Sequence, residues 1–202
     1  MISPSIPTPE NTRRPKKTTQ KRAPVTTKLR KIQEIPVGED GQPVLPMQIG
    51  IMTLHSLGAV VTDRENFHSE RYIYPVGYCV SRQYASMIDP ERSVIYTSRV
   101  LDGGDGPRFH VVAEDMPDKP IVANSATGAW TTIIKNANQL RNREHSNSAS
   151  GPDYFGFSQP SIAKMIQDLP GADLCKSYVH QEVRYQHLRS WLPLASLGCI
   201  GL

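Results

Sequence analysis

The chain has 202 residues, of which 38% are hydrophobic and 21% charged, and its formal net charge is +4. This length suffices for one core of ordinary size but not comfortably for two, and the low hydrophobic content predicts that part of the chain lies outside the fold. The cysteines Cys79, Cys175 and Cys199 are far apart and form no CxxC pair, which argues against a zinc site or a disulfide framework. No apolar run approaches the roughly 18–20 residues of a membrane span, so we expect an intracellular protein without membrane contact.

The charge is divided unevenly along the chain. Residues 1–33 contain nine Lys or Arg and a single acidic residue, Glu10, whereas residues 34–202 contain fourteen basic and eighteen acidic residues. The first segment is also rich in Pro, Ser and Thr, so it cannot bury enough apolar surface to offset the entropy lost on ordering. We therefore expect residues 1–33 to be a disordered basic tail, followed by a mildly acidic folded part that does not grip nucleic acid over a broad face.

Two basic runs in this tail, "RRPKK" and "QKR", are typical of a nuclear-import signal, and the same charges would attract nucleic-acid phosphates. The candidates for import or phosphate contact are Arg13, Arg14, Lys16, Lys17, Lys21 and Arg22. Binding through phosphates alone would be weak, steeply salt-dependent and without sequence specificity. An inert, solvated tail is the alternative.

Beyond the tail, residues 34–48 form a turn-rich lead-in, in which Asp40-Gly41 favours a tight turn. From Ile49 the segment "IGIMTLHSLGAVVT" is rich in β-branched and apolar residues, which predicts a strand. Within it, Gly58 indicates a bulge or a point of close approach.

The next segments also favour strands. In "RYIYPVGYCVS", Tyr72 and Tyr74 would share one strand face, and Pro75 fits an edge or a bend better than the middle of a central strand. The runs "SVIYTSRVLD" and "RFHVVAED" flank the glycine-rich link Gly103–Pro107, and this arrangement predicts a hairpin.

Two helices are predicted after these strands. Residues 127–140 place apolar residues on one stripe, with Ser125 or Thr127 as the N-cap, and residues 160–169 begin with Pro160 at a first-turn position. A last run, "YVHQEVRYQHL", predicts a half-buried strand whose buried face carries Val179, Val183 and Tyr185. Strands followed by helices, without regular alternation, predict an α+β fold with a mainly antiparallel sheet.

Several long phrases resemble a known family. "GIMTLHSLGAVV", "FHSERYIYPVGYCVSRQYAS" and "VIYTSRVLDGG" resemble FYRN, the Phe/Tyr-rich N-terminal motif of chromatin-associated proteins, and "GPRFHVVAED", "GAWTTII" and "DYFGFSQPSIAKMIQDLPGADLCKSY" resemble its partner FYRC. The resemblance runs from about Ile49 to Tyr185. It implies one module at 49–188, with FYRN at about 49–102 and FYRC at about 103–188, and it leaves 189–202 as an unassigned C-terminal tail.

The resemblance also carries functional expectations. It implies a single unit in which FYRN and FYRC strands share one sheet with two packed helices, and it implies nuclear residence without catalysis by this module. The expected partners are chromatin-regulator proteins, and the expected role is protein–protein contact in transcriptional or cell-cycle regulation.

Twelve aromatic residues mark the two motifs, and five of them fall between Phe67 and Tyr84. The set is Phe67, Tyr72, Tyr74, Tyr78, Tyr84, Tyr96, Phe109, Trp130, Tyr154, Phe155, Phe157 and Tyr178. A base-stacking platform or a methyl-lysine cage is one interpretation. We favour a structural role, with rings in a core and hydroxyls reaching backbone or water at its edge, because basic and acidic neighbours nearly balance.

The remaining motifs predict no catalysis, cofactor, metal or small-molecule substrate. "DGGDG" (Asp102–Gly106) lacks the alternating carboxylates and closing Glu of a calcium loop and precedes no helix, so it predicts a turn. Neither Ser56 nor Ser86 lies in a nucleophile elbow. Cys199–Leu202 is a poor prenylation box, since glycine replaces its aliphatic third position. The histidines show no HxH or HExxH spacing; they are His55, His68, His110, His145, His180 and His187.

Overall fold

The computed structural model describes residues 30–32, 34–143 and 149–185. The predicted disorder of residues 1–29 and 33, the six basic import candidates and the unassigned tail at 189–202 all lie outside these described residues. The strands and helices are β1 (Arg30–Ile32), β2 (Met47–Ile49), β3 (Met52–Ser56), η1 (Glu65–Phe67), β4 (Cys79–Ala85), β5 (Ser93–Asp102), β6 (Pro107–Ala113), β7 (Met116–Ala123), α1 (Ala126–Leu140), α2 (Gly151–Tyr154), α3 (Pro160–Gln167), η2 (Ala172–Leu174) and β8 (Val183–Tyr185).

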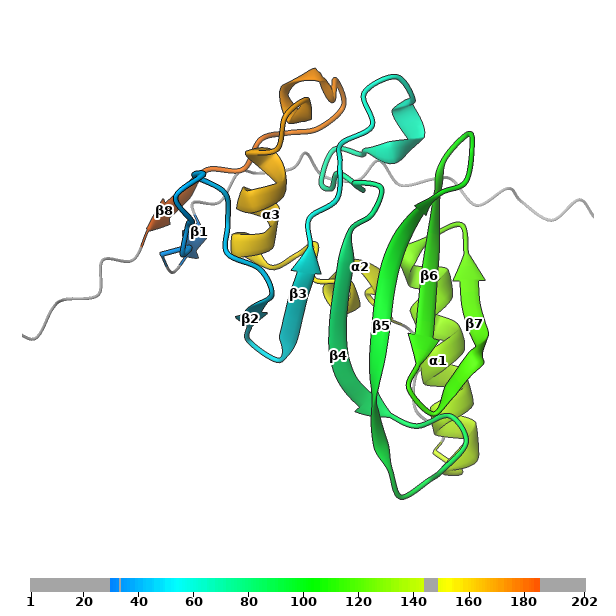
Figure 1. Cartoon of the computed structure of the whole chain (residues 1–202). Coiled ribbons are helices and arrows are strands. Elements are labelled where there is room, and N and C mark those ends of the chain that lie inside the picture. The colour runs from blue at the N-terminus through cyan, green and yellow to red at the C-terminus, as the bar shows by residue number, and fades with distance from the viewer. Residues whose placement is uncertain (1–29, 33, 144–148, 186–202) are drawn as a thin grey trace, which may run out of the picture.

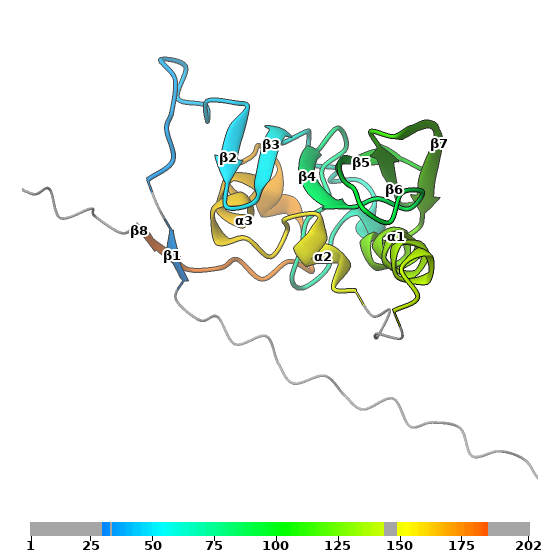
Figure 2. The same cartoon turned by 90° about the horizontal axis from the view of Figure 1, so that it is seen from below.

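Six of these strands form one antiparallel sheet in the order β2-β3-β4-β5-β6-β7, and β1 pairs with β8 in a separate parallel pair. The helices α1, α2 and α3 all lie on the same side of the large sheet, and no described element covers the opposite face along β4–β7 (Figures 1 and 2). The prediction of an α+β fold with a mainly antiparallel sheet is therefore confirmed.

The sheet is continuous across the FYRN-like and FYRC-like halves. β5 belongs to the first half and β6 to the second, and they are paired from Tyr96↔Ala113 to Asp102↔Pro107 around the predicted glycine-rich turn. Alternation sorts the side chains of β5: Val94, Tyr96, Ser98 and Val100 are buried, while the intervening residues face outward. The predicted hairpin is therefore confirmed, and it joins the two halves.

The helices bury one stripe each. In α1 the hydroxyl oxygen of Ser125 accepts a hydrogen bond from the Gly128 N–H at 3.0 Å, so Ser125 is the N-cap. The buried stripe of α1 consists of Ala126, Ala129, Trp130, Ile133, Ile134 and Ala137. In α3, Pro160 begins the helix as predicted. The short helix α2 lies between these two helices in the chain, with Pro152 in its first turn.

The strand β7, which contains Pro117 and Pro120, was not predicted. Proline removes a backbone donor, so a strand with two prolines is tolerated at the edge of a sheet and not at its centre. β7 occupies one edge of the large sheet, and the three-residue strand β2 occupies the other.

Four local predictions were wrong. The predicted disorder of residues 1–33 is wrong for Arg30–Ile32, because these residues form β1 and Ile32 is buried. The segment from Ile49 is not one strand, since β2 and β3 form a hairpin around a turn at Gly50. Tyr72 and Tyr74 lie outside any named strand.

The last run is the fourth correction. Only Val183–Tyr185 is a strand there, and Val179 and Tyr185 are 38% and 47% exposed, so no half-buried face joins them.

Gly58 is a point of close approach, as predicted. It has a φ of +71°, and an added Cβ would overlap the carbonyl oxygen of Val76 and the amide nitrogen of Tyr78. Ala59 and Val76 exchange two backbone hydrogen bonds beside this contact, at 2.8 and 2.9 Å. The missing side chain therefore allows the chain after β3 to lie against the segment that leads into β4.

We expect Gly58→Ala to lower the free energy of unfolding by at least about 2 kcal/mol, since it adds left-handed strain to a clash with backbone atoms. Gly104→Ala is the matched control, because Gly104 has a φ of +83° but no atom within 4 Å of an added Cβ. The control should lose only about 1 kcal/mol. Urea unfolding of both variants measures the difference, and equal losses would contradict the packing role.

Candidate interaction surface

The twelve predicted aromatic residues are brought together inside the fold. Eight of them are buried: Phe67, Tyr78, Tyr96, Phe109, Trp130, Phe155, Phe157 and Tyr178. The other four are half-buried: Tyr72, Tyr74, Tyr84 and Tyr154. Most of the rings form two clusters that lie between the sheet and the helical segments.

The first cluster surrounds Tyr78. Its hydroxyl donates a hydrogen bond to the Phe155 carbonyl at 2.7 Å, and its ring centroid lies 4.7 Å from that of Phe157. Tyr74 meets Phe109 edge to face, at 5.2 Å between centroids. Burial raises the pKa of Tyr78 far above its usual value, so its hydroxyl stays protonated and remains a donor. This cluster joins residues of both halves through rings and one buried hydrogen bond.

The second cluster contains the only described cation that lies over two of these rings. Trp130 and Tyr154 stack with centroids 4.5 Å apart, and the guanidinium carbon of Arg82 lies 4.4 Å from the Tyr154 ring and 5.5 Å from the Trp130 ring. Burial lowers the pKa of Arg82. A methyl-lysine cage needs its aromatic faces free for a ligand cation, whereas here the chain's own guanidinium occupies them.

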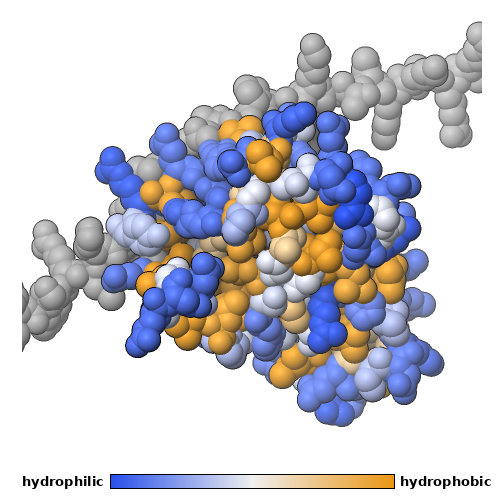
Figure 3. Space-filling view, turned by 45° about the horizontal axis from the view of Figure 1, so that its top comes forward, coloured by the Kyte–Doolittle hydropathy of each residue, from blue (hydrophilic) through white to orange (hydrophobic). Residues whose placement is uncertain are grey.

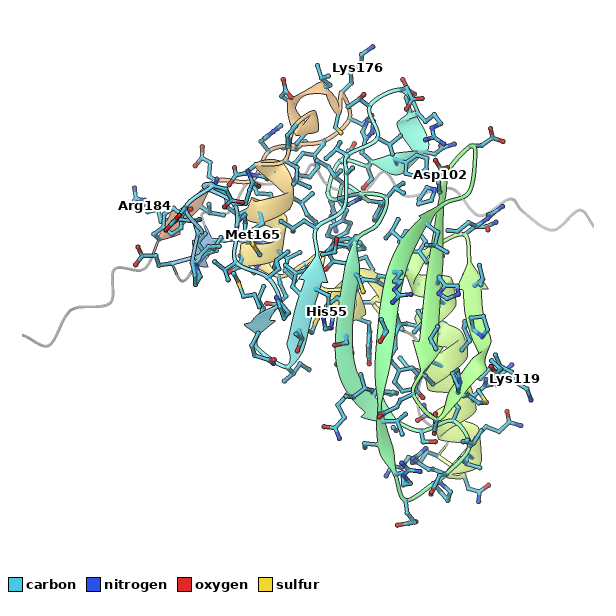
Figure 4. All side chains as sticks on the ribbon, in the orientation of Figure 1. His55, Asp102, Lys119, Met165, Lys176 and Arg184 are labelled. Carbon is cyan, nitrogen blue, oxygen red and sulfur yellow. The ribbon has the colours of Figure 1, made fainter. Side chains whose placement is uncertain are left out.

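A polar link connects the loop around η1 to the β5–β6 turn. Arg64 donates two hydrogen bonds to the Asp102 carboxylate, at 2.7 and 2.9 Å, and a third to the Gly104 carbonyl. Asn66 donates to the Asp105 carbonyl at 2.8 Å. The bidentate contact with Arg64 is the main reason that the pKa of Asp102 falls to about 2. Asp102 lies at the end of β5 beside this turn (Figure 4).

A cavity of about 380 Å³ lies beside this link, at the junction of the two halves. Asn66 and Tyr74 line it from the first half, and Arg108, Phe109 and Thr127 are among the residues that line it from the second. Arg108 already donates a hydrogen bond to the side-chain oxygen of Asn124. The cavity thus has mixed lining and one guanidinium with a neutral partner.

Catalytic chemistry finds little support among the described residues. No cluster of three or more His, Cys, Asp or Glu side chains that could hold a metal occurs in that part of the chain. His55 Nε2 and Ser81 Oγ are 2.7 Å apart, but they lie on the exposed face of the sheet and no hydrogen bond orients the other ring nitrogen. Ser86 is buried and donates to Asp115 at 2.6 Å while accepting N–H groups of its own turn.

The residues that make up the uncovered face of the sheet were not identified from the sequence. Register places Cys79, Arg99, His110 and Val122 in one row across β4–β7, and Ser81, Thr97 and Val112 in the next. Ile95, Leu101 and Val122 are 48%, 40% and 55% exposed. Figure 3 shows hydrophobic and hydrophilic groups interspersed on the side of the molecule that it displays. Alternation in β5 was visible in the sequence, but only the strand register shows which outward residues adjoin.

Comparison with known proteins agrees with the sequence resemblance. The FYRN family, described as "F/Y-rich N-terminus", matches residues 44–103, and the FYRC family, "F/Y rich C-terminus", matches residues 106–186. The chain therefore belongs to the proteins that carry joined FYRN and FYRC regions. Among the described residues, no helix is long and apolar enough to cross a membrane.

Two kinds of relative are similar to the chain. Transforming growth factor beta regulator 1 is 40% identical in Homo sapiens over 81% of this chain, and 36% identical in Xenopus tropicalis over 85% of it. Histone-lysine N-methyltransferase TRX1 of Oryza sativa subsp. japonica is 31% identical over 70% of this chain and over 14% of its own length. The chain spans 40% of the human regulator and 42% of the frog one.

The buried hydroxyl of Tyr78 gives a test of the first aromatic cluster. We expect Tyr78→Phe to lower the free energy of unfolding by about 1–2 kcal/mol, because it leaves the Phe155 carbonyl without its buried donor. Tyr185→Phe is the control, since Tyr185 is largely exposed, and it should change stability by less than about 0.5 kcal/mol. Chemical denaturation measures both, and an unchanged Tyr78→Phe variant would show that the hydroxyl does not hold the halves together.

Proposed function

We propose that this chain is a nuclear, non-catalytic interaction protein whose FYRN–FYRC module makes protein–protein contacts with chromatin regulators, in transcriptional or cell-cycle regulation. The observation that carries the proposal is the shared sheet. The strands of the two halves pair with each other, and one broad face of the sheet is left uncovered. The aromatic residues that could have formed a ligand site are turned into the core.

The relatives support the same proposal. The FYR regions are found both in transforming growth factor beta regulator 1 and in proteins named histone-lysine N-methyltransferases. A module that recurs in proteins of different names, and that covers a small part of the methyltransferases, is best explained as a contact unit. We assign the module to residues 49–188, together with β1 and β2 from the preceding segment.

The sheet edges are poor docking sites, so the uncovered face is the better candidate for contact. β7 carries Pro117, Asp118, Lys119 and Pro120 along one edge, and prolines and charges of this kind block the addition of a further strand. At the other edge, β2 offers only three residues. A partner therefore gains more by covering the face than by extending the sheet.

The proposal is tested by affinity capture from nuclease-treated nuclear extract, with the full chain and with a chain lacking residues 1–29 as baits. The shorter bait keeps every described residue, including β1. We expect both to capture the same chromatin-regulator proteins, because the contacts are made by the folded module. The proposal would be contradicted if nuclease treatment abolished capture, or if removal of residues 1–29 abolished it.

A second candidate function is weak nucleic-acid binding through the basic tail, favoured by the density of positive charge in residues 1–33. If Arg13, Arg14, Lys16, Lys17, Lys21 and Arg22 each contact a phosphate, the logarithm of the affinity should fall with the logarithm of salt concentration with a slope near −5 for duplex DNA. Fluorescence anisotropy with and without residues 1–29 measures this. Binding that survives removal of the tail would exclude the tail as its source.

A further inference from the structure

We propose that the uncovered face of the six-stranded sheet binds an acidic amphipathic helix of a partner protein, centred on the row Cys79, Arg99, His110 and Val122. This inference rests on the proposed function, and it names the surface and the kind of partner. We call this surface the outer face; it comprises the outward residues of β4, β5, β6 and β7. Those that carry the argument are Cys79, Ser81, Ile95, Thr97, Arg99, Leu101, Arg108, His110, Val112 and Val122.

The outer face has positive charge without compensation. The guanidinium of Arg99 makes no ion pair or hydrogen bond with any described side chain, and Arg108 donates only to the neutral Asn124. Arg99 lies directly across the strand pair from His110, and burial, followed by the charge of Arg99, lowers the pKa of that imidazole. A lowered pKa favours the neutral imidazole, so Arg99 carries the charge of this row, and an external carboxylate would give its guanidinium an ion-pair partner.

The acidic groups nearest this face already have partners, and Glu114 lies beside Ile95, several residues along β5 from Arg99. Asp102, next to Leu101, is held by Arg64, and the carboxylate of Glu114 accepts the N–H of Ile95. The residues from 34 to 202 are nevertheless acidic in sum. A local basic patch on an acidic domain is a specific feature of this face, and it selects a partner of opposite sign.

Apolar side chains surround these charges and determine the form of the partner. Ile95, Leu101 and Val122 are partly exposed, and small residues such as Ser81 and Thr97 lie between them. A helix with one apolar stripe and acidic residues beside it would cover the apolar groups and place carboxylates near Arg99 and Arg108. Helices already pack in this way on the other side of the same sheet (Figure 2).

The alternatives fit less well. The chain's own basic N-terminal segment has the wrong sign, and residues 186–202 contain one arginine and no acidic residue. A second copy that packed through the same face would bring its Arg99 and Arg108 close to those of the first copy, and the like charges would repel. A nucleic acid would find no Phe, Tyr or Trp side chain for stacking among the outer-face residues named above.

The test uses the full chain, isotopically labelled, and a synthetic helical peptide of about 20 residues, a length that spans roughly 30 Å. The peptide has leucines in the i, i+3, i+4, i+7 pattern and glutamates on both sides. A second peptide has lysines in place of the glutamates, and a short DNA duplex is a third probe. We expect the acidic peptide alone to bind and to shift the amide signals of β5 and β6.

The variant Arg99→Glu/Arg108→Glu should bind the acidic peptide about tenfold more weakly, since two exposed ion pairs are replaced by repulsion. Its matched control is Lys176→Glu/Arg184→Glu, which makes the same change of net charge at two exposed sites away from the sheet (Figure 4). Arg99→Gln/Arg108→Gln removes the charges without reversing them and should weaken binding by an intermediate factor. The control should bind like the unchanged chain.

Four results would overturn the assignment: equal binding by both double-glutamate variants, tighter binding of the lysine peptide or of DNA, dimerisation through the outer face in sedimentation, and altered β5 signals on deletion of residues 189–202. Affinity capture from nuclear extract distinguishes a failure of this inference from a failure of the proposed function. If the unchanged chain and Arg99→Glu/Arg108→Glu capture the same proteins, the outer face is not the docking surface and the interaction function stands. If neither captures any, the interaction function itself fails.

Discussion

The pairing of β5 with β6 is the contact on which the rest of this structure depends. It joins the two halves through a ladder that begins at a four-residue turn, so the entropy lost in bringing the strands together is small. It also fixes which side chains face the helices, since a slip by one residue would turn Tyr96, Val100 and Phe109 outward. The aromatic clusters and the outer face are both consequences of this one register.

The aromatic residues explain why the two motifs need each other. A tyrosine can be buried at low cost only if its hydroxyl finds a hydrogen-bond partner, and three buried tyrosines donate to carbonyl or side-chain oxygens. Tyr78 donates to the Phe155 carbonyl, Tyr96 to the Ala85 carbonyl at 2.9 Å, and Tyr178 to the Gln167 side chain at 2.6 Å. The first of these bonds spans the two motifs, so neither motif alone could satisfy that ring.

Local patterns in the sequence were sufficient for the elements that carry their own signal. The glycine-rich turn, the two β-rich runs that flank it and the apolar stripe of α1 are all short-range features, and each formed as predicted. The prolines of β7 concealed a strand whose edge position only the tertiary structure reveals. The pairing of β1 with β8 joins segments some 150 residues apart through three residues each, and three residues carry no periodicity. The outer face depends on cross-strand neighbours, which a single strand does not specify.

The asymmetry of the sheet links the fold to its proposed use. One face is covered by helices that supply rings and hydrogen-bond partners to the core. Both edges discourage strand addition, one through prolines and charges and the other through its brevity. The outer face combines exposed apolar groups with guanidinium groups that have no carboxylate partner among the described residues, and exposing these groups to water costs little free energy. It can therefore exist in the free protein and still gain from a partner whose carboxylates and apolar stripe meet both kinds of group.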